Sequence, residues 1–269
     1  MRRIGLLGGM SWESTAVYYR LLNEGARERL GGLHSADLVL RSVDFADIAE
    51  LQHASAWEAL GATLAAEAAA LVAAGAEVLG IATNTMHLVA PQIAAAAGIP
   101  LVHIVDVVGE AARARGVDRV AVLGTEFTMT SSLYTEGMAR HGVEVVVPDA
   151  GDRRVVHDVI YDELCRGVVL DSSRRRYEEI VARLADRGAR AVVLGCTEIS
   201  LLLGQSEVEG VPVLDSTALH ATALLDAALL DAALLDTAVP DPAPAARVAA
   251  PRLTPVPDPL AETRQERSA

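Results

Sequence analysis

Two loops far apart in the sequence place a small hydroxyl or thiol side chain directly after an apolar run. The first, GIATNTMH, carries Thr83, and the second, LGCTEIS, carries Cys196. A thiol has an ordinary pKa of about 8.5, so its thiolate can act as a base near neutral pH, whereas an alcohol can only donate a proton. The two loops therefore place side chains of different chemistry, a hydroxyl and a thiol, at matching positions.

The elements that carry these loops follow a β-then-α order, which predicts an α/β fold with parallel sheets covered by helices. In the first half we expect strands over residues 2–8, 36–45, 77–83 and 99–105 and helices over 12–30, 57–76 and 87–98, the first capped by Ser11. Ligands bind at the carboxyl ends of parallel strands. Four loops follow such strands: residues 8–11, 83–85, 124–130 and 196–198.

The pattern then begins again. Gly8 and Gly124 stand 116 residues apart, and Thr83 and Cys196 stand 113 apart in matching runs. Near-equal offsets favour a duplicated unit. We therefore expect two similar doubly wound α/β domains related by a pseudo-two-fold axis, with the active site in the cleft between them. The predicted division is 1–105, completed by a helix over about 216–236, then 106–215, then a disordered Pro/Ala-rich tail over 239–269.

Composition excludes several functions. All 23 basic residues are arginine, so neither a pyridoxal-phosphate Schiff base nor a Walker-type phosphate loop can form. The net charge of −13 argues against nucleic-acid binding, and no apolar run is long enough to span a membrane. Histidine and cysteine lack metal-site spacing. We expect a cytoplasmic protein without metal or cofactor.

Each candidate also has a structural interpretation. Thr85 and Thr197 can cap helices, and Gly8-Gly9 lacks the full GxGxxG spacing of a dinucleotide site. We interpret Cys165, within VIYDELCRG, as a buried core residue on a helix. Cys196 differs because it precedes a predicted helix, whose N-terminal dipole should lower the pKa of its thiol.

Five stretches together resemble the aspartate/glutamate/hydantoin racemase superfamily: GLLGGMSWEST, TNTMH, GTEFTMTSSLY, YDELCRG and LGCTEISLLL. The resemblance runs from about Arg3 to His220 and is strongest to the cofactor-independent aspartate/glutamate racemase branch. It implies two α/β domains with two cysteines facing each other across the substrate α-carbon. The family pattern is Cys-Asn-Thr in the first half and Gly-Cys-Thr-Glu in the second. Here the second is intact and the first reads Thr83-Asn84-Thr85.

The resemblance implies a role for each matching residue. Cys196 corresponds to the thiol expected to act on the L-enantiomer, and Thr83 stands where the second thiol is missing. The remaining positions correspond to residues that bind the substrate or line its pocket: Met10, Ser11, Gln52, Asn84, Thr85, Thr125, Thr130, Thr197 and Glu198. The resemblance also implies a homodimer and an amino-acid substrate related to aspartate or glutamate. No arginine stands in the site loops, and Arg41 is the one candidate we can name for a side-chain carboxylate.

Four alternatives stand against this interpretation. A single-cysteine relative can be a decarboxylase of substituted malonates, in which the lone thiol protonates an enediolate. Maleate isomerisation by a related fold is expected to need both cysteines. A non-catalytic amino-acid-binding protein would keep the fold without needing the activated Cys196, and a dehydrogenase is opposed by the missing glycine fingerprint.

Overall fold

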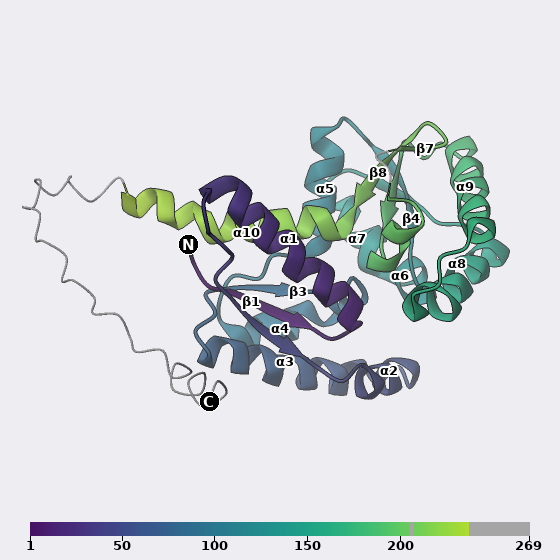
Figure 1. Ribbon diagram of the computed structural model, residues 1–269. Coiled ribbons are helices and arrows are strands. Elements are labelled where there is room, and N and C mark those ends of the chain that lie inside the picture. Colours follow the sequence, from purple (N-terminus) through teal and green to yellow (C-terminus); the bar gives the residue numbers. More distant parts are fainter. Residues whose placement is uncertain (205–206, 237–269) are drawn as a thin grey trace, which may run out of the picture.

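Two lobes, each built on a parallel sheet, make up the described part of the chain (Figure 1). The computed structural model describes residues 1–204 and 207–236. The first lobe is built on the strands β1 (Ile4–Gly8), β2 (Leu38–Ser42) and β3 (Val78–Ile81), in the order β2-β1-β3. A parallel bridge from Leu79 to Leu101 extends this sheet. The strand predicted over 99–105 is thus reduced to one bridge, because the chain turns into a helix at Ile104.

The helices of the first lobe begin close to the predicted residues. They are α1 (Trp12–Leu30), α2 (Phe45–His53), α3 (Trp57–Ala73), the 3-10 helix η1 (Thr85–Val89) and α4 (Ala90–Ala97). Ser11 caps α1 as predicted, since its Oγ accepts a hydrogen bond from the Ser14 amide at 3.3 Å. The turn before it needs glycine: Gly9 has φ +91°, and a Cβ there would lie 2.3 Å from the Val43 carbonyl oxygen.

The second lobe repeats the first. Its strands are β4 (Arg119–Leu123), β5 (Glu144–Val146), β6 (Ala191–Leu194), β7 (Glu207–Val208) and β8 (Val211–Asp215), in the order β5-β4-β6-β8-β7. The strand order is the same in both sheets. The second sheet has β5-β4-β6-β8 where the first has β2-β1-β3 followed by the Leu101 bridge. The protein therefore has the predicted α/β fold of two similar parallel-sheet units. Only β7 pairs antiparallel, and the sequence did not suggest it.

Helices cover both faces of the second sheet. They are α5 (Ile104–Ala114), α6 (Glu126–Thr130), α7 (Ser132–Ala139), α8 (Ala150–Asp162), η2 (Leu164–Arg166), α9 (Asp171–Asp186) and η3 (Thr197–Leu201). Buried apolar side chains form separate clusters on the two faces of each sheet. Strands buried on both faces hold the loops at their carboxyl ends in fixed positions.

The last described helix, α10 (Ser216–Asp236), runs from β8 back over the first lobe, where it packs against α1 (Figure 1). After the first turn, where Ser216 and Thr217 are buried, its buried residues lie on one side of the helix: His220, Ala221, Leu224, Leu225 and Ala228. The division at residue 105 stays a prediction, and the tail predicted over 239–269 lies outside the described residues. None of the described helices combines the length and hydrophobicity needed to cross a bilayer.

Candidate active site

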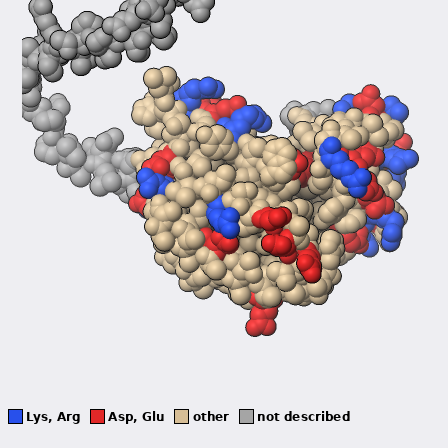
Figure 2. Space-filling model, turned by 60° about the horizontal axis from the view of Figure 1, so that its bottom comes forward, with Lys and Arg blue, Asp and Glu red and all other residues tan. Residues whose placement is uncertain are grey.

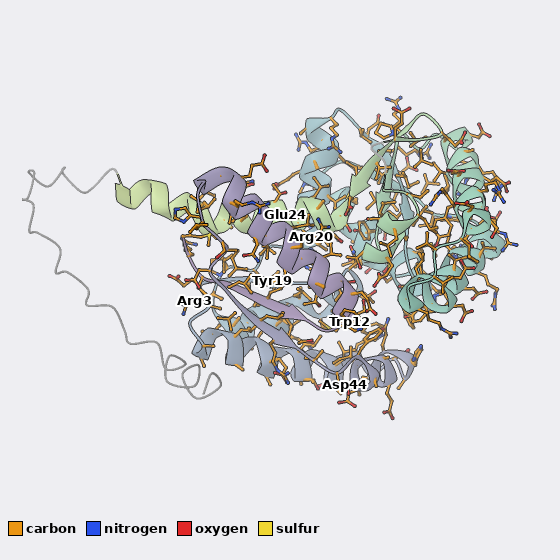
Figure 3. All side chains as sticks on the ribbon, viewed as in Figure 1. Arg3, Trp12, Tyr19, Arg20, Glu24 and Asp44 are labelled. Carbon is orange, nitrogen blue, oxygen red and sulfur yellow. The ribbon has the colours of Figure 1, made fainter. Side chains whose placement is uncertain are left out.

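One cavity of about 50 Å³ lies where the carboxyl ends of the two sheets meet. Loops of both lobes line it. The lining residues are Met10, Ser11, Ser14, Phe45, Gln52, Thr83, Asn84, Thr85, Met86, Thr125, Ile160, Tyr161, Cys165, Gly195, Cys196, Thr197 and Glu198. Figure 3 shows Trp12, which follows Ser11, and Asp44, which precedes Phe45, on the side of the first lobe that faces the second.

The cavity brings together ten of the eleven residues that the sequence singled out. Thr83 and Cys196 both line it, each from the loop after a strand. Thr130 does not. Its side chain is exposed at the end of α6, where its hydroxyl donates to the Glu126 carbonyl at 2.7 Å, so the helix directs it away from the cavity.

The Glu198 carboxylate is the polar centre of the cavity. It is 6% exposed and accepts hydrogen bonds from both lobes. Ser11 donates to Oε1 at 2.6 Å and Ser14 at 3.0 Å, while Thr197 donates to Oε2 at 2.7 Å. Burial alone would raise the pKa of Glu198, but these bonds and one from Cys196 outweigh it and lower that pKa. Glu198 is therefore ionised and joins the two lobes.

The Cys196 thiol donates to Glu198 Oε2 at 2.9 Å. Burial raises the pKa of this thiol well above its usual value, and the adjacent negative charge of Glu198 raises it further. The prediction of a lowered pKa is therefore wrong for the protein without substrate. The helix after Cys196 is a five-residue 3-10 turn, whose small dipole cannot offset these two effects.

The Thr83 side of the cavity is held by buried hydrogen bonds. Asn84 Nδ2 donates to Ser216 Oγ at 3.1 Å, and Asn84 Oδ1 accepts from the Tyr134 hydroxyl at 2.6 Å. Thr85 Oγ1 lies 3.1 Å from Thr128 Oγ1. These bonds fix the loop, leaving one N–H of the Asn84 amide for a ligand.

Sequence reasoning missed Cys165, which lines the cavity and is half-buried. α8 ends at Asp162, and the following turn η2 packs against η3, which brings Cys165 close to Cys196. Burial and the charge of Glu198 raise the pKa of Cys165 to about 12. Tyr161 lines the same wall, and burial followed by the charge of Cys196 raises its pKa to about 12. In the sequence, the four-residue spacing of Tyr161 and Cys165 was the signal that could have indicated that both lie on one wall of the cavity.

The cavity-lining residues of the described chain include no arginine and no histidine. Arg41 does not reach it: its Nη2 donates to Glu67 Oε1 at 2.9 Å, and its side chain is exposed at the surface. The described residues also form no group of three or more His, Cys, Asp or Glu side chains that could hold a metal ion. The chemistry available here is therefore that of two thiols, hydroxyls, amides and one carboxylate.

Comparison with known proteins fits this geometry. The family model for Asp/Glu/hydantoin racemases matches residues 7–224, which include both cavity loops. The chain belongs to the Asp/Glu/hydantoin racemase family. The resemblance inferred from the five sequence stretches is thereby confirmed, although the family assignment does not address the threonine at position 83.

Solved structures of this family share the fold. A candidate Asp/Glu racemase from Yersinia pestis superimposes with a TM-score of 0.80 at 44% identity, covering 85% of this chain and 100% of that one. An aspartate racemase homologue from Pyrococcus horikoshii gives a TM-score of 0.75 at 35% identity, covering 85% and 99%. A broad specificity amino-acid racemase from Bacillus subtilis is 24% identical over 148 residues, 54% of this chain and 61% of the relative. These likenesses support an amino-acid racemase, an isomerase that needs no pyridoxal phosphate.

Proposed function

We propose that the protein is a cofactor-independent racemase that acts on aspartate/glutamate-like L-amino acids. Cys196 is the base that removes the α-proton, and the Thr83 side returns a proton to the opposite face. The observation that carries this proposal is that Thr83 and Cys196 line one cavity from equivalent loops of the two lobes.

The protonated thiol of the free protein sets the order of events. Glu198 carries a negative charge 2.9 Å from Cys196 Sγ, so an arriving α-ammonium group has a ready partner. That positive charge offsets the carboxylate and favours the thiolate, and the Cys196 thiol releases its proton to water as the substrate binds. The thiolate then takes the α-proton and becomes a thiol again, and the electron pair left on Cα is delocalised into the substrate carboxylate.

Hydrogen-bond donors stabilise the carbanion that forms. Asn84, Thr85 and Thr197 line the cavity, and the free N–H of the Asn84 amide together with the two hydroxyls can hold the substrate carboxylate. The cavity is largely enclosed by both lobes, which strengthens these interactions by excluding water.

The Thr83 side works differently. An alcohol is far too weakly acidic to supply a base, yet its hydroxyl, or a water that it holds, can donate a proton. Protonation from this side completes the inversion of an L-amino acid. The alkoxide or hydroxide left behind takes a proton back from solvent, and the Cys196 thiol releases the proton it gained when the next substrate binds. Removal of the α-proton from a D-amino acid needs a base on the Thr83 side, so the D-enantiomer is expected to react poorly.

Hydrogen exchange at Cα in heavy water, followed by NMR, tests the proposal. The wild type should exchange the α-proton of L-amino acids, and Cys196→Ser should not. Cys165→Ser is the matched control, a thiol in the same cavity that the mechanism does not use. Equal loss in both variants would contradict the assignment of Cys196 as the base, and absence of exchange in the wild type would contradict the racemase itself.

We also propose a homodimer located in the cytoplasm. Trp12 is 67% exposed and Tyr19 is 53% exposed on α1, where Figure 3 shows both along one helix. Large aromatic side chains at a surface favour association with a partner. Light scattering of the wild type against Trp12→Ser tests the dimer: a monomeric wild type would contradict it. Cell fractionation tests the location.

A further inference from the structure

A second cavity lies between the two lobes, and η1 separates it from the active site. It encloses about 470 Å³, whereas the active-site cavity encloses about 50 Å³. η1 and α4 form one of its walls and α7 forms the other, and no described residue lines both cavities. Met86 lines the active-site cavity, and the next residue, His87, lines the second one. η1 is therefore a partition between the two cavities.

Two buried histidine nitrogens in the wall of the second cavity lack a hydrogen-bond partner. They are His87 Nε2 and His103 Nδ1, and no described residue bonds to either. The neighbouring His220 shows the ordinary arrangement, because its Nδ1 lies 2.7 Å from the Tyr18 hydroxyl and its Nε2 lies 2.8 Å from the Val102 carbonyl oxygen. His87 is 2% exposed. Buried polar atoms are rarely left without a partner, so the two nitrogens point to a ligand that supplies one.

The proton on the His87 ring is placed by the other ring nitrogen. Nδ1 lies 2.9 Å from the Thr83 carbonyl oxygen, which can only accept, so Nδ1 carries the proton. Burial lowers the pKa of His87 well below its usual value, and His220 and His103 lower it further, so the ring is neutral. A neutral ring with its proton on Nδ1 has a lone pair on Nε2. A ligand that pairs with His87 Nε2 must therefore donate the hydrogen bond.

His103 places the second polar atom at the same end of the cavity. The ring centroids of His87 and His103 are 4.7 Å apart. Burial lowers the pKa of His103, although Asp106 opposes this shift, so this ring is also neutral near pH 7. Its Nδ1 lies 3.9 Å from Asp106 Oδ2, which is too far for a hydrogen bond. The polar end of the cavity is therefore uncharged.

The rest of the cavity favours an uncharged and largely apolar ligand. Apolar side chains supply much of the lining: Leu88, Ala90, Pro91, Leu101 and Leu133. The charged lining residues, Glu136 and Arg140, are exposed, and Arg140 already donates to Asp106 at 2.8 Å. On the face shown in Figure 2, charged side chains likewise project from a largely uncharged surface. A charged group brought to the two histidines would lose its hydration without gaining an opposite charge.

We infer that this cavity is a second ligand-binding site, which takes small uncharged molecules that are mostly apolar and donate a hydrogen bond to His87 Nε2. A concave apolar lining with a few buried polar atoms is typical of small-molecule sites. The inference does not depend on the proposed racemase function.

A ligand bound in this way also acts on the active-site loop. Its hydrogen bond to Nε2 strengthens the bond that His87 Nδ1 donates to the Thr83 carbonyl, because hydrogen bonds in a chain polarise one another. An occupied cavity therefore holds the Thr83 loop more firmly than an empty one.

Indole and benzofuran test the site, because they have nearly the same shape and only indole carries an N–H donor. Each is titrated into wild-type protein labelled with ¹⁵N-histidine and followed by NMR. Indole should bind about tenfold or more tightly than benzofuran, since a bond to a buried atom without a partner contributes about that factor. Indole should also move the His87 Nε2 resonance upfield and its Nδ1–H proton downfield, while benzofuran leaves the Nε2 resonance in place.

Three results in the wild type would overturn the inference. Equal affinities for the two molecules would show an apolar cavity without a hydrogen-bonding site. Failure of both to bind would show that the cavity takes no such ligand. Indole binding that tightens as the protein is diluted from dimer to monomer would show that a second copy of the chain fills the cavity.

Replacing His87 with phenylalanine should remove the preference for indole. His87→Phe keeps an aromatic ring of similar size and removes the lone pair, so the ratio of the two affinities should fall from about tenfold to near one. His34→Phe is the matched control, because His34 is exposed and lies outside the cavity lining. An unchanged ratio in His87→Phe would overturn the role of His87. The wild-type titrations stand as the test if His87→Phe fails to fold.

Discussion

Replacing Glu198 with glutamine should have opposite effects on the reactivity of Cys196 and on catalysis. The carboxylate is 6% exposed and accepts the thiol hydrogen bond at 2.9 Å. Its charge disfavours the thiolate in the free protein, so its removal makes Cys196 more reactive. The same charge is the proposed partner of the substrate ammonium, so its removal weakens substrate binding.

The magnitude follows from the distance. Two unit charges 2.9 Å apart interact by about 6 kcal/mol at an effective dielectric constant of about 20. This is an upper bound, because a thiolate would move away from the carboxylate and water would enter. If removing the charge relieves only a quarter of that energy, the thiolate population of Cys196 already rises about tenfold. We therefore expect at least about tenfold faster alkylation of Cys196 at neutral pH and at least about tenfold higher KM for the L-amino acid.

Two assays on one preparation check both effects. The iodoacetamide rate at Cys196, resolved from Cys165 by peptide mass spectrometry, gives the thiolate population, and α-proton exchange gives KM. Glu50→Gln removes an exposed carboxylate of α2 as the matched control. Slower alkylation in Glu198→Gln would refute the electrostatic reasoning, and an unchanged KM would refute the proposed ammonium partner.

Three further predictions follow from named contacts. Thr83→Cys should supply the missing base and raise D-enantiomer exchange about a hundredfold or more, as general bases typically do; an unchanged rate of D-exchange would contradict the assignment of Thr83. Arg41→Gln should change L-exchange less than about twofold, because Arg41 pairs with Glu67 at the surface; a loss beyond tenfold would place Arg41 in the site. Burial lowers the pKa of His220 to about 4, whereas a histidine in the unfolded chain has a pKa of about 6.5. Above pH 6.5 His220 is neutral in both states, so the free energy of unfolding is not reduced. As the pH falls toward 4, the unfolded chain binds the proton more readily than the folded one, and this free energy decreases. Urea unfolding at pH 7 and pH 4 should therefore show a loss of about 3 kcal/mol that His220→Asn reduces, and an equal loss in both proteins would contradict this account.

The parts of the fold set by local pattern could be predicted from the sequence. The β-then-α order, the Ser11 cap and the start of α10 at Ser216 depend on residues close in the chain. The matching offsets of Gly8 and Gly124 likewise predicted the repeated strand order. The prediction of a strand over 99–105 was wrong because the apolar residues there also suit a helix. This helix, α5, begins at Ile104 and packs on the second sheet.

The site was less predictable where tertiary packing decides the surroundings of a side chain. Loop position identified Cys196, but the pKa of its thiol depends on Glu198, whose charge the serines of the other lobe stabilise. Cys165 resembled a core residue because nothing local shows that η2 packs against η3. Thr130 shares a motif with Thr125, yet the turn of α6 directs its side chain to solvent.

The enantiomers compared in one exchange assay test the central claim most directly. Thr83 and Cys196 line one cavity, and in the proposed mechanism Cys196 is the base while Thr83 supplies only a hydroxyl. In heavy water, wild-type protein should exchange the α-proton of an L-amino acid while the D-form of the same amino acid stays essentially unlabelled. Equal initial rates of exchange for the two enantiomers would contradict the account.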